Sequence, residues 1–244
     1  LTHDERQLLL ELIKRRVNER VPVPYLTKKA WYAGLPFVVD ERVLIPRSPI
    51  FELIEVECKP WFRAPLDRPV RFLDLCTGSG CLGITLALSV AESTGVLADL
   101  EAGACEVAQE NVEFHQVGDR VEVIQSDGFN ELFDERFDLI ICNPPYVDAE
   151  DMAELPPEYQ KEPAVALASG EDGLDLVRRL LSQAADWLSD EGIMILEVGN
   201  TWGLLDREVV ARTGEPVQWC QFEFGGHGVC VLSKRELNAL YSAF

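Results

Sequence analysis

A buried strand that runs into a glycine-rich loop and then a helix is the feature that most limits how this chain can fold. Residues 70–75, VRFLDL, are mostly apolar, and Gly78, Gly80 and Gly83 follow them at the spacing GxGxxG. Glycines at such a step let the backbone approach a ligand and direct helix N–H groups at an anion. Taken alone, the spacing also fits a dinucleotide fingerprint. The step predicts an α/β fold with a ligand crevice at the carboxyl end of the strand.

Strand and helix patterns alternate from here to the end of the chain. Further strands are predicted at residues 94–100, 121–127, 137–143 and 192–199, followed by a terminal antiparallel pair at 217–224 and 228–234. Helices are predicted over residues 81–90, 101–116 and 174–188. This order predicts a twisted, mainly parallel, doubly wound sheet of seven strands, closed by the antiparallel pair and joined by right-handed crossovers.

The beginning of the chain has a different pattern. A helix is predicted over residues 4–20, two short strands within 31–46, and an irregular lead-in over 58–69. We therefore expect a small arm of helix and hairpin on the substrate side, residues 1–57, and a larger body, residues 58–244.

Composition excludes several classes of protein. Seven scattered cysteines without a CxxC pair argue for reduced thiols in a core, so neither a disulfide framework nor a metal site is expected. The net charge of −20 disfavours tight binding to DNA and favours a basic partner, although it also suits a merely soluble surface. No apolar run is long enough for a membrane helix and no signal peptide opens the chain, so we expect a cytoplasmic protein.

Three acidic residues stand where successive predicted strands end: Asp74, Asp99 and Asp127. Ligands of an open α/β sheet lie across the carboxyl ends of adjacent strands. Asp99 could therefore accept both hydroxyls of a ribose, and Asp127 could accept the exocyclic amine of an adenine. Each acid could instead cap a loop, and Asp74 could hold the backbone N–H groups of the glycine loop.

The fourth strand of the body ends in a rigid step, Asn143-Pro144-Pro145-Tyr146. Proline fixes φ and keeps the preceding residue extended. The side-chain oxygen of Asn143 and the carbonyl of Pro144 can then be held as two fixed acceptors, with Tyr146 as a flat wall beside them. Two convergent acceptors and a flat wall suit a planar group that carries an NH₂. That group is a carboxamide or the amine of a nucleobase.

Nitrogens of this kind are poor nucleophiles because their lone pair is delocalised. Holding both N–H bonds would orient the nitrogen and stabilise the positive charge that develops as it attacks an electrophilic methyl group. Displacement at a sulfonium methyl needs no metal, and no dedicated general base is demanded. The predicted catalytic residues are Asn143, Pro144 and Tyr146.

With the motifs DLCTGSG, Asp99 and NPPY, the chain resembles the protein-glutamine methyltransferases, which are Rossmann-like class I enzymes that depend on S-adenosylmethionine. The resemblance covers nearly all 244 residues and implies methyl transfer to the side-chain amide nitrogen of a glutamine. The cofactor site that it implies comprises Asp74, Cys76, Thr77, Gly78, Ser79, Gly80, Asp99, Asp127, Phe129 and Asn143. Family members usually have a longer N-terminal helical region, so the resemblance implies that the arm of this chain is trimmed.

Residues 46–50, Pro-Arg-Ser-Pro-Ile, discriminate between branches of this family. Release-factor enzymes typically read Pro-Arg-Pro-Glu-Thr-Glu there. The chain is instead similar to the branch that methylates the third protein of the large ribosomal subunit, a basic ribosomal protein. The implied substrate-binding residues are Arg47, Asn143, Pro144, Pro145 and Tyr146. Arg47 could equally anchor the arm through a salt bridge.

Other functions stay open at this point. They are a release-factor glutamine methyltransferase, a DNA adenine methyltransferase, a non-catalytic ribosome-assembly factor and a nicotinamide dehydrogenase. The acidic segment 147–173 could cover the site and contact a basic substrate, or it could be a solvated loop. A structural role is also open for Glu197, which ends the fifth strand, and His227 fits a turn because no partner is identifiable.

Overall fold

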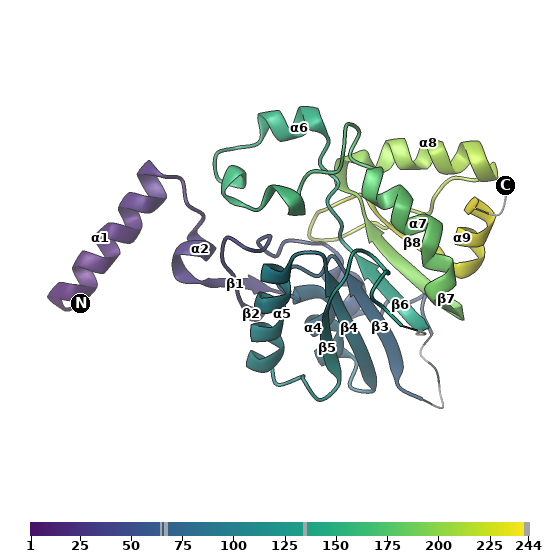
Figure 1. Ribbon diagram of the computed structural model, residues 1–244, viewed down its shortest axis with the longest axis horizontal. Helices are drawn as coiled ribbons and strands as arrows, with labels where there is room; N and C mark the ends of the chain where they lie inside the picture. The colour runs from purple at the N-terminus through teal and green to yellow at the C-terminus, as the bar shows by residue number, and fades with distance from the viewer. Residues whose placement is uncertain (64, 66–67, 134–135, 242–244) are drawn as a thin grey trace.

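The structure, a computed structural model, describes residues 1–63, 65, 68–133 and 136–241 (Figure 1). The lead-in predicted over residues 58–69 lies partly outside the described residues. The described helices are α1 (His3–Asn18), α2 (Val23–Thr27), α3 (Phe51–Glu55), α4 (Cys81–Ser89), α5 (Ala102–Phe114), α6 (Ala149–Glu154), α7 (Asp175–Trp187), α8 (Trp202–Thr213) and α9 (Lys234–Tyr241). The described strands are β1 (Lys29–Tyr32), β2 (Leu35–Val38), β3 (Val70–Leu75), β4 (Ser93–Asp99), β5 (Val121–Gln125), β6 (Phe137–Cys142), β7 (Leu188–Glu197) and β8 (Val229–Ser233).

The strands of the body form one sheet in the order β5-β4-β3-β6-β7-β8. Neighbours pair in parallel from β5 to β7, whereas β8 runs antiparallel to β7. Leu75 at the end of β3 pairs with Ala98 of β4 on one side and with Cys142 of β6 on the other. The glycine loop, Asp99 and Asn143 therefore meet at one edge of the sheet. This arrangement confirms the predicted mainly parallel, doubly wound α/β fold.

The predicted count of seven strands is wrong, because the described part of the chain forms a sheet of six. The segment predicted as the first strand of the terminal pair keeps a single bridge, between Trp219 and Cys230. The backbone N–H groups of Glu223 and Phe224 donate to the carboxylate of Glu52 instead of to a neighbouring strand. A side chain of the arm thus takes the donors that a strand ladder would need.

The arm forms a hairpin as predicted, but at a different place. β1 and β2 pair antiparallel over residues 29–38, and the turn between them lies at Ala33 and Gly34, both with positive φ. The predicted strand region extended to residue 46, but the structure shows that residues 39–46 are irregular. Asp40 accepts the backbone N–H and the guanidinium of Arg42, and this local turn ends the extended chain.

Helices cover both faces of the sheet (Figure 1), and an apolar cluster lies on each face. On one face, Phe72 and Leu97 pack with α4, α5 and the hairpin arm, and on the other face Leu73 and Met194 pack with α7, α8 and α9. Apolar residues therefore alternate between the faces along each strand, as a sheet buried on both sides requires. The hairpin shares a hydrophobic core with the body. We therefore propose that residue 57 separates two parts with different functional roles, and not two independently packed units.

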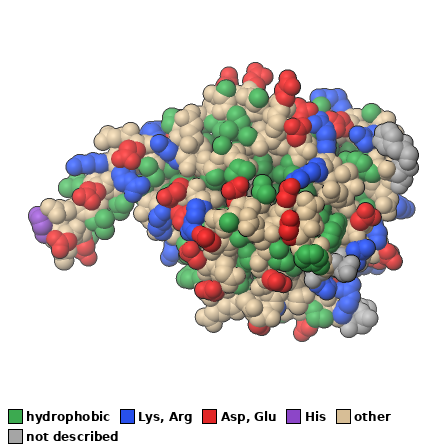
Figure 2. All heavy atoms as spheres, viewed as in Figure 1, with side chains coloured by type: hydrophobic (Ala, Val, Ile, Leu, Met, Phe, Trp, Pro, Cys, Tyr) green, Lys and Arg blue, Asp and Glu red, His purple; other side chains and the backbone are tan. Residues whose placement is uncertain are grey.

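Helix α1 projects away from the body, and none of its residues is buried (Figure 1). Thr2 and Glu5 form a capping box at its start, as helices with such a pattern do. Its exposed apolar side chains are visible among the charged ones in Figure 2 and include Leu8, Leu9, Leu10, Ile13 and Val17. Within the described part of the chain, no helix is long and apolar enough to cross a membrane.

Candidate active site

The glycine loop between β3 and α4 is held open by its own backbone geometry. Cys76, Gly78 and Gly80 all have positive φ, which is the left-handed region that glycine adopts most easily. A Cβ added at Gly78 would meet no atom within 4 Å, so this glycine faces open space. At Gly80, a Cβ would press on Ile84 and Leu97 instead. The loop thus presents Gly78 to a ligand and packs Gly80 against the sheet.

Asp74 holds this loop and the start of α4 through two hydrogen bonds. Its Oδ2 accepts a hydrogen bond of 2.6 Å from the hydroxyl of Thr77 and one of 2.9 Å from the backbone N–H of Gly83. Its Oδ1 is buried and has no partner among the described residues. Burial raises the pKa of Asp74 to about 7, although these hydrogen bonds act to lower it. Of the two roles open to Asp74 from the sequence, the structure shows that of holding the loop.

Asp99 ends β4 beside Gly78. One carboxylate oxygen accepts the backbone N–H of Gly78 at 2.8 Å, and the other accepts that of Glu101 at 3.0 Å. Burial raises the pKa of this carboxyl, and its hydrogen bonds to these N–H groups act to lower it. Since each carboxylate oxygen can accept more than one hydrogen bond, Asp99 can still accept ligand hydroxyls.

The NPPY step follows β6 at the same edge of the sheet. The side-chain oxygen of Asn143 is buried and has no hydrogen-bond partner among the described residues. Buried acceptors are rarely left unpaired in folded proteins, and such exceptions often mark functional groups. The hydroxyl of Tyr146 donates to Glu197 at 3.0 Å, and its ring lies against Gly199, where any Cβ would collide with it. Asn143 therefore presents an acceptor without a partner in the described part of the chain, and Glu197 and Gly199 fix Tyr146 nearby. Tyr146 and Pro144 do not line the cavity that contains Asn143, so their contact with a substrate amide stays a prediction.

A cavity of about 110 Å³ joins these elements. Gly78, Asp99, Asn143 and Pro145 line it from the strand ends, and Cys76 lies beside them. Residues 42–44 of the arm also line it, as do Pro163, Val165 and Ala166 of the acidic segment. Part of the acidic segment therefore lies at the cavity, and its role as a cover that contacts a basic substrate stays a prediction. Figure 2 shows acidic side chains on the surface over α6.

The remaining residues of the predicted cofactor site either lie outside the cavity or form hydrogen bonds that hold the glycine loop. Asp127 forms an ion pair with Arg179 of α7, which lowers the pKa of this carboxyl. Phe129 is buried and stacks on Trp187, with ring centroids 5.4 Å apart. Neither lines the cavity, so their contact with an adenine stays a prediction. The carbonyl of Ser79 accepts from Asn111, which also bonds to the hairpin.

Arg47 connects the arm to the acidic segment. Its Nη1 lies 2.8 and 2.9 Å from the two carboxylate oxygens of Glu162, and its guanidinium lies over the ring of Tyr159. The backbone N–H of Ile45 donates to the same carboxylate at 3.0 Å. The structure therefore shows the anchoring role that the sequence left open, and substrate binding by Arg47 stays a prediction.

Ser48 and Glu197 form a buried pair that the sequence analysis did not predict, although it left a structural role open for Glu197. Glu197 is 5% exposed and accepts hydrogen bonds from Ser48 at 2.5 Å and from Tyr146 at 3.0 Å. An acid that ends a buried strand next to NPPY was the available signal for Glu197. Its partner Ser48 lies 149 residues away, so only the fold reveals the pair. His227, by contrast, is exposed and contacts Asn200.

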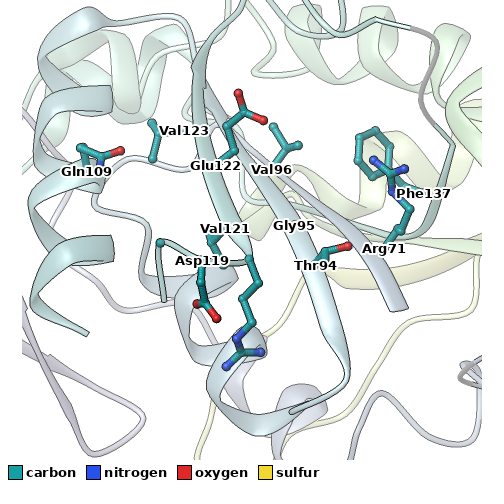
Figure 3. Close-up of a pocket in the computed structure, with 12 residues that line it drawn as sticks. Arg71, Thr94, Gly95, Val96, Gln109, Asp119, Val121, Glu122, Val123 and Phe137 are labelled. Carbon is teal, nitrogen blue, oxygen red and sulfur yellow. The ribbon is translucent and has the colours of Figure 1, made fainter. Parts of the chain in front are cut away.

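A larger hollow of about 550 Å³ lies at the opposite edge of the sheet (Figure 3). Thr94 and Gly95 at the start of β4 line it, together with Val121 and Glu122 of β5. Ligands of open α/β sheets bind at the carboxyl ends of the strands, and this hollow lies at the amino ends. No group of three His, Cys, Asp or Glu residues placed to hold a metal ion occurs among the described residues.

Comparison with known proteins agrees with this geometry. A family model described as "Methyltransferase small domain" matches residues 63–156. The ribosomal protein uL3 glutamine methyltransferase of Francisella tularensis is 42% identical, over 100% of this chain and 76% of that protein. The enzyme of the same name from Bordetella pertussis is 48% identical, over 96% of this chain and 77% of that protein. The chain belongs to this glutamine methyltransferase family.

Solved structures show the same fold as this glutamine methyltransferase. The catalytic domain of human hMettl16, crystallised with the MAT2A 3'UTR hairpin 6, has a TM-score of 0.63 at 16% identity, over 96% of this chain and 82% of that one. A methyltransferase from Pyrococcus furiosus has a TM-score of 0.58 at 18% identity, over 96% of this chain and 99% of that one. The predicted Rossmann-like class I fold and the predicted enzyme class are confirmed, with S-adenosylmethionine as the methyl donor.

Proposed function

We propose that this glutamine methyltransferase transfers the methyl group of S-adenosylmethionine to the side-chain amide nitrogen of a glutamine in ribosomal protein uL3. One observation carries the proposal: the buried oxygen of Asn143 has no partner among the described residues, at the cavity shared with Gly78 and Asp99. A carboxamide N–H is a donor of the right kind for this oxygen. The two relatives named as uL3 glutamine methyltransferases support the choice of substrate.

The residues at the cavity fit the methyl donor. Gly78 leaves space next to the loop backbone, and Asp99 offers carboxylate oxygens for ribose hydroxyls. Cys76 and Pro145 complete the wall on either side. When bound, S-adenosylmethionine supplies an electrophilic methyl group on a sulfonium sulfur. This group would be the electrophile for the amide nitrogen, and S-adenosylhomocysteine would be the product of the donor.

The chain contributes alignment and electrostatics to this transfer. Asn143 and the carbonyl of Pro144 accept the two amide N–H bonds, which turns the nitrogen lone pair toward the methyl group. Tyr146 limits the amide plane from one side. As positive charge develops on the nitrogen, both acceptors stabilise it. The proton then leaves to water, because a methylated amide that carries a positive charge is strongly acidic.

The partner in this proposal is a basic ribosomal protein, and the net charge of −20 suits such a partner. Stable binding to DNA is not part of the proposal, because phosphate contacts need clustered Lys and Arg. A cytoplasmic location fits a ribosomal substrate and stays a prediction. Duplex DNA that competes with uL3 for the enzyme at physiological salt would contradict this view of the partner.

A comparison of substrates tests the proposed function. The enzyme is incubated with S-adenosylmethionine and either uL3 or a release factor, and peptides are mapped by mass spectrometry. We expect the mass of one added methylene unit on a glutamine of uL3, and none or far less on the release factor. Methylation of the release factor alone would show that the chain is a release-factor glutamine methyltransferase instead. Absence of methylation on both would contradict the proposal.

A further inference from the structure

Glu197 lies directly beside the NPPY step. Leu196 of β7 pairs with Cys142 of β6, so the residues that follow them, Glu197 and Asn143, stand side by side at the ends of adjacent strands. Both oxygens of this carboxyl are engaged: Oε2 accepts the hydroxyl of Ser48 at 2.5 Å, and Oε1 accepts the hydroxyl of Tyr146 at 3.0 Å. Glu197 thus links Ser48 of the arm to Tyr146 of the NPPY step.

Two hydroxyls, rather than a cation, hold this buried acid. The ion pairs of the described residues do not include Glu197, and Arg47 pairs with Glu162 instead. A buried carboxyl without a salt-bridge partner depends strongly on its hydrogen bonds, because its desolvation is otherwise uncompensated. Burial accordingly raises the pKa of Glu197, whereas its bonds to Ser48 and Tyr146 and, as a smaller effect, the charge of Arg47 act to lower it. Loss of either hydroxyl leaves an oxygen without a donor.

Ser48 is itself fixed from two sides. Its Oγ accepts the backbone N–H of Ile50 at 3.2 Å, which leaves its hydroxyl proton for Glu197. Its carbonyl accepts the hydroxyl of Tyr32 at 3.0 Å, and Tyr32 belongs to the hairpin. Ser48 is 4% exposed, so water does not readily replace these contacts. The arm therefore presents one hydroxyl in one direction.

Tyr146 has little freedom once its hydroxyl is held. Its ring lies against Gly199, and its carbonyl lies where a Cβ on Gly173 would collide. The remaining motion of the ring is a tilt about the NPPY backbone, which the hydrogen bond to Glu197 resists. A tilt would displace the wall against which the amide rests. Small misplacements in a methyl-transfer geometry reduce rates by up to about 100-fold.

We propose that Glu197 and Ser48 are positioning residues that fix Tyr146 for methyl transfer, so that the hairpin arm sets the geometry of the substrate amide. The kinetic half of this inference, a lower rate of methyl transfer, rests on the proposed function. The structural half, that the position of Tyr146 depends on Ser48 through Glu197, is independent of that function. The two halves are therefore tested by different measurements on the whole chain.

The structural half is tested by NMR of the protein with labelled tyrosine and no substrate. We expect Ser48→Ala and Glu197→Gln to shift the ring signals of Tyr146, whereas Ser48→Thr, which keeps the hydroxyl, leaves them near their wild-type positions. Ser182→Ala, on an exposed face of α7, is the matched control. Unchanged Tyr146 signals in folded Ser48→Ala and Glu197→Gln would overturn the proposal, and no methylation assay enters this result.

The kinetic half is tested with uL3 and S-adenosylmethionine. We expect Ser48→Ala, Glu197→Gln and Tyr146→Phe each to lower kcat by about 10- to 100-fold, with the Kd of S-adenosylhomocysteine within about twofold of wild type. Ser48→Thr should restore most of the rate, and Ser48→Ala with Tyr146→Phe should lose no more than the worse single variant, since both act through one chain. Losses that multiply, or that follow cofactor affinity, would overturn the proposal. A wild-type enzyme inactive on uL3 would contradict the proposed function alone, because the NMR result stands separately.

Discussion

Arg47 of the arm and Glu162 of the acidic segment form an ion pair in which one guanidinium nitrogen lies 2.8 and 2.9 Å from the two carboxylate oxygens. Glu162 is followed by Pro163, Val165 and Ala166, which line the cavity. Arg16 and Arg20 of the arm also bind Glu158 of the same segment. These ion pairs join the arm to the segment that lines the cavity, and we expect them to hold that segment in place.

Arg47→Met should loosen this segment without unfolding the protein. Because Arg47 is partly exposed, we expect the ion pair to contribute only about 1 kcal/mol, which corresponds to about fivefold more frequent opening of the segment. Cleavage within residues 147–173 by a glutamate-specific protease measures this opening. Arg47→Lys, which keeps the charge, should lie between the variant and wild type. Equal cleavage rates for all three proteins would contradict the anchoring role.

Asp99→Ala should weaken the binding of S-adenosylmethionine by about 10- to 100-fold, the range expected for a lost charge-assisted hydrogen bond. Isothermal titration calorimetry measures this change directly. Asp119→Ala is the matched control, because Asp119 lines the hollow at the amino ends of the strands. An unchanged Kd in Asp99→Ala would remove this residue from the cofactor site. Asp127→Ala in the same series tests the predicted adenine contact, which its ion pair with Arg179 disfavours.

Asp74 predicts a particular dependence of stability on pH. Burial raises its pKa to about 7 in the folded protein, whereas an unfolded chain loses this proton near pH 4, at about 3.9. Between these values the folded state binds more protons, so the contribution of Asp74 to the free energy of unfolding falls as pH rises. Asp74→Asn keeps the acceptor for Thr77 and Gly83 and cannot titrate.

The stability of wild type relative to Asp74→Asn should therefore decline by up to about 1.4 kcal/mol per pH unit across this window. Urea unfolding of both proteins without cofactor, at several pH values between about 4 and 7, measures the difference. A difference that stays constant with pH would show that the Asp74 carboxyl ionises normally in the folded protein.

Local sequence patterns predicted the parallel strands of the sheet and the residues at their carboxyl ends, because both depend on residues close in sequence. Apolar runs predicted the parallel strands, and the polar residues at the ends of these strands, Asp99 and Asn143, were predicted to lie in the site. The edge strand predicted at residues 217–224 failed, since Glu52, far away in the chain, binds its N–H groups. Helices α8 and α9 were not predicted at all.

Partners distant in sequence explain the other differences. Asp127 matched the pattern of a ligand-binding acid, yet Arg179 of α7 pairs with it. Phe129 follows β5 as a cofactor-facing residue would, yet Trp187 receives its ring. Ser48 carried information only as part of a family motif until the fold placed it against Glu197. A sequence pattern shows which residues reach the edge of the sheet, but not which of them are already paired there.

The most direct measurement compares methyl transfer to uL3 by wild type and Asn143→Ala, together with their stability. Removal of the acceptor should lower kcat by about 100- to 1000-fold. The free energy of unfolding should stay unchanged or rise slightly, because a buried oxygen without a partner is lost. Asn18→Ala, at the exposed end of α1, is the control. If Asn143→Ala methylates uL3 at the wild-type rate, Asn143 does not hold the substrate amide and the account is contradicted.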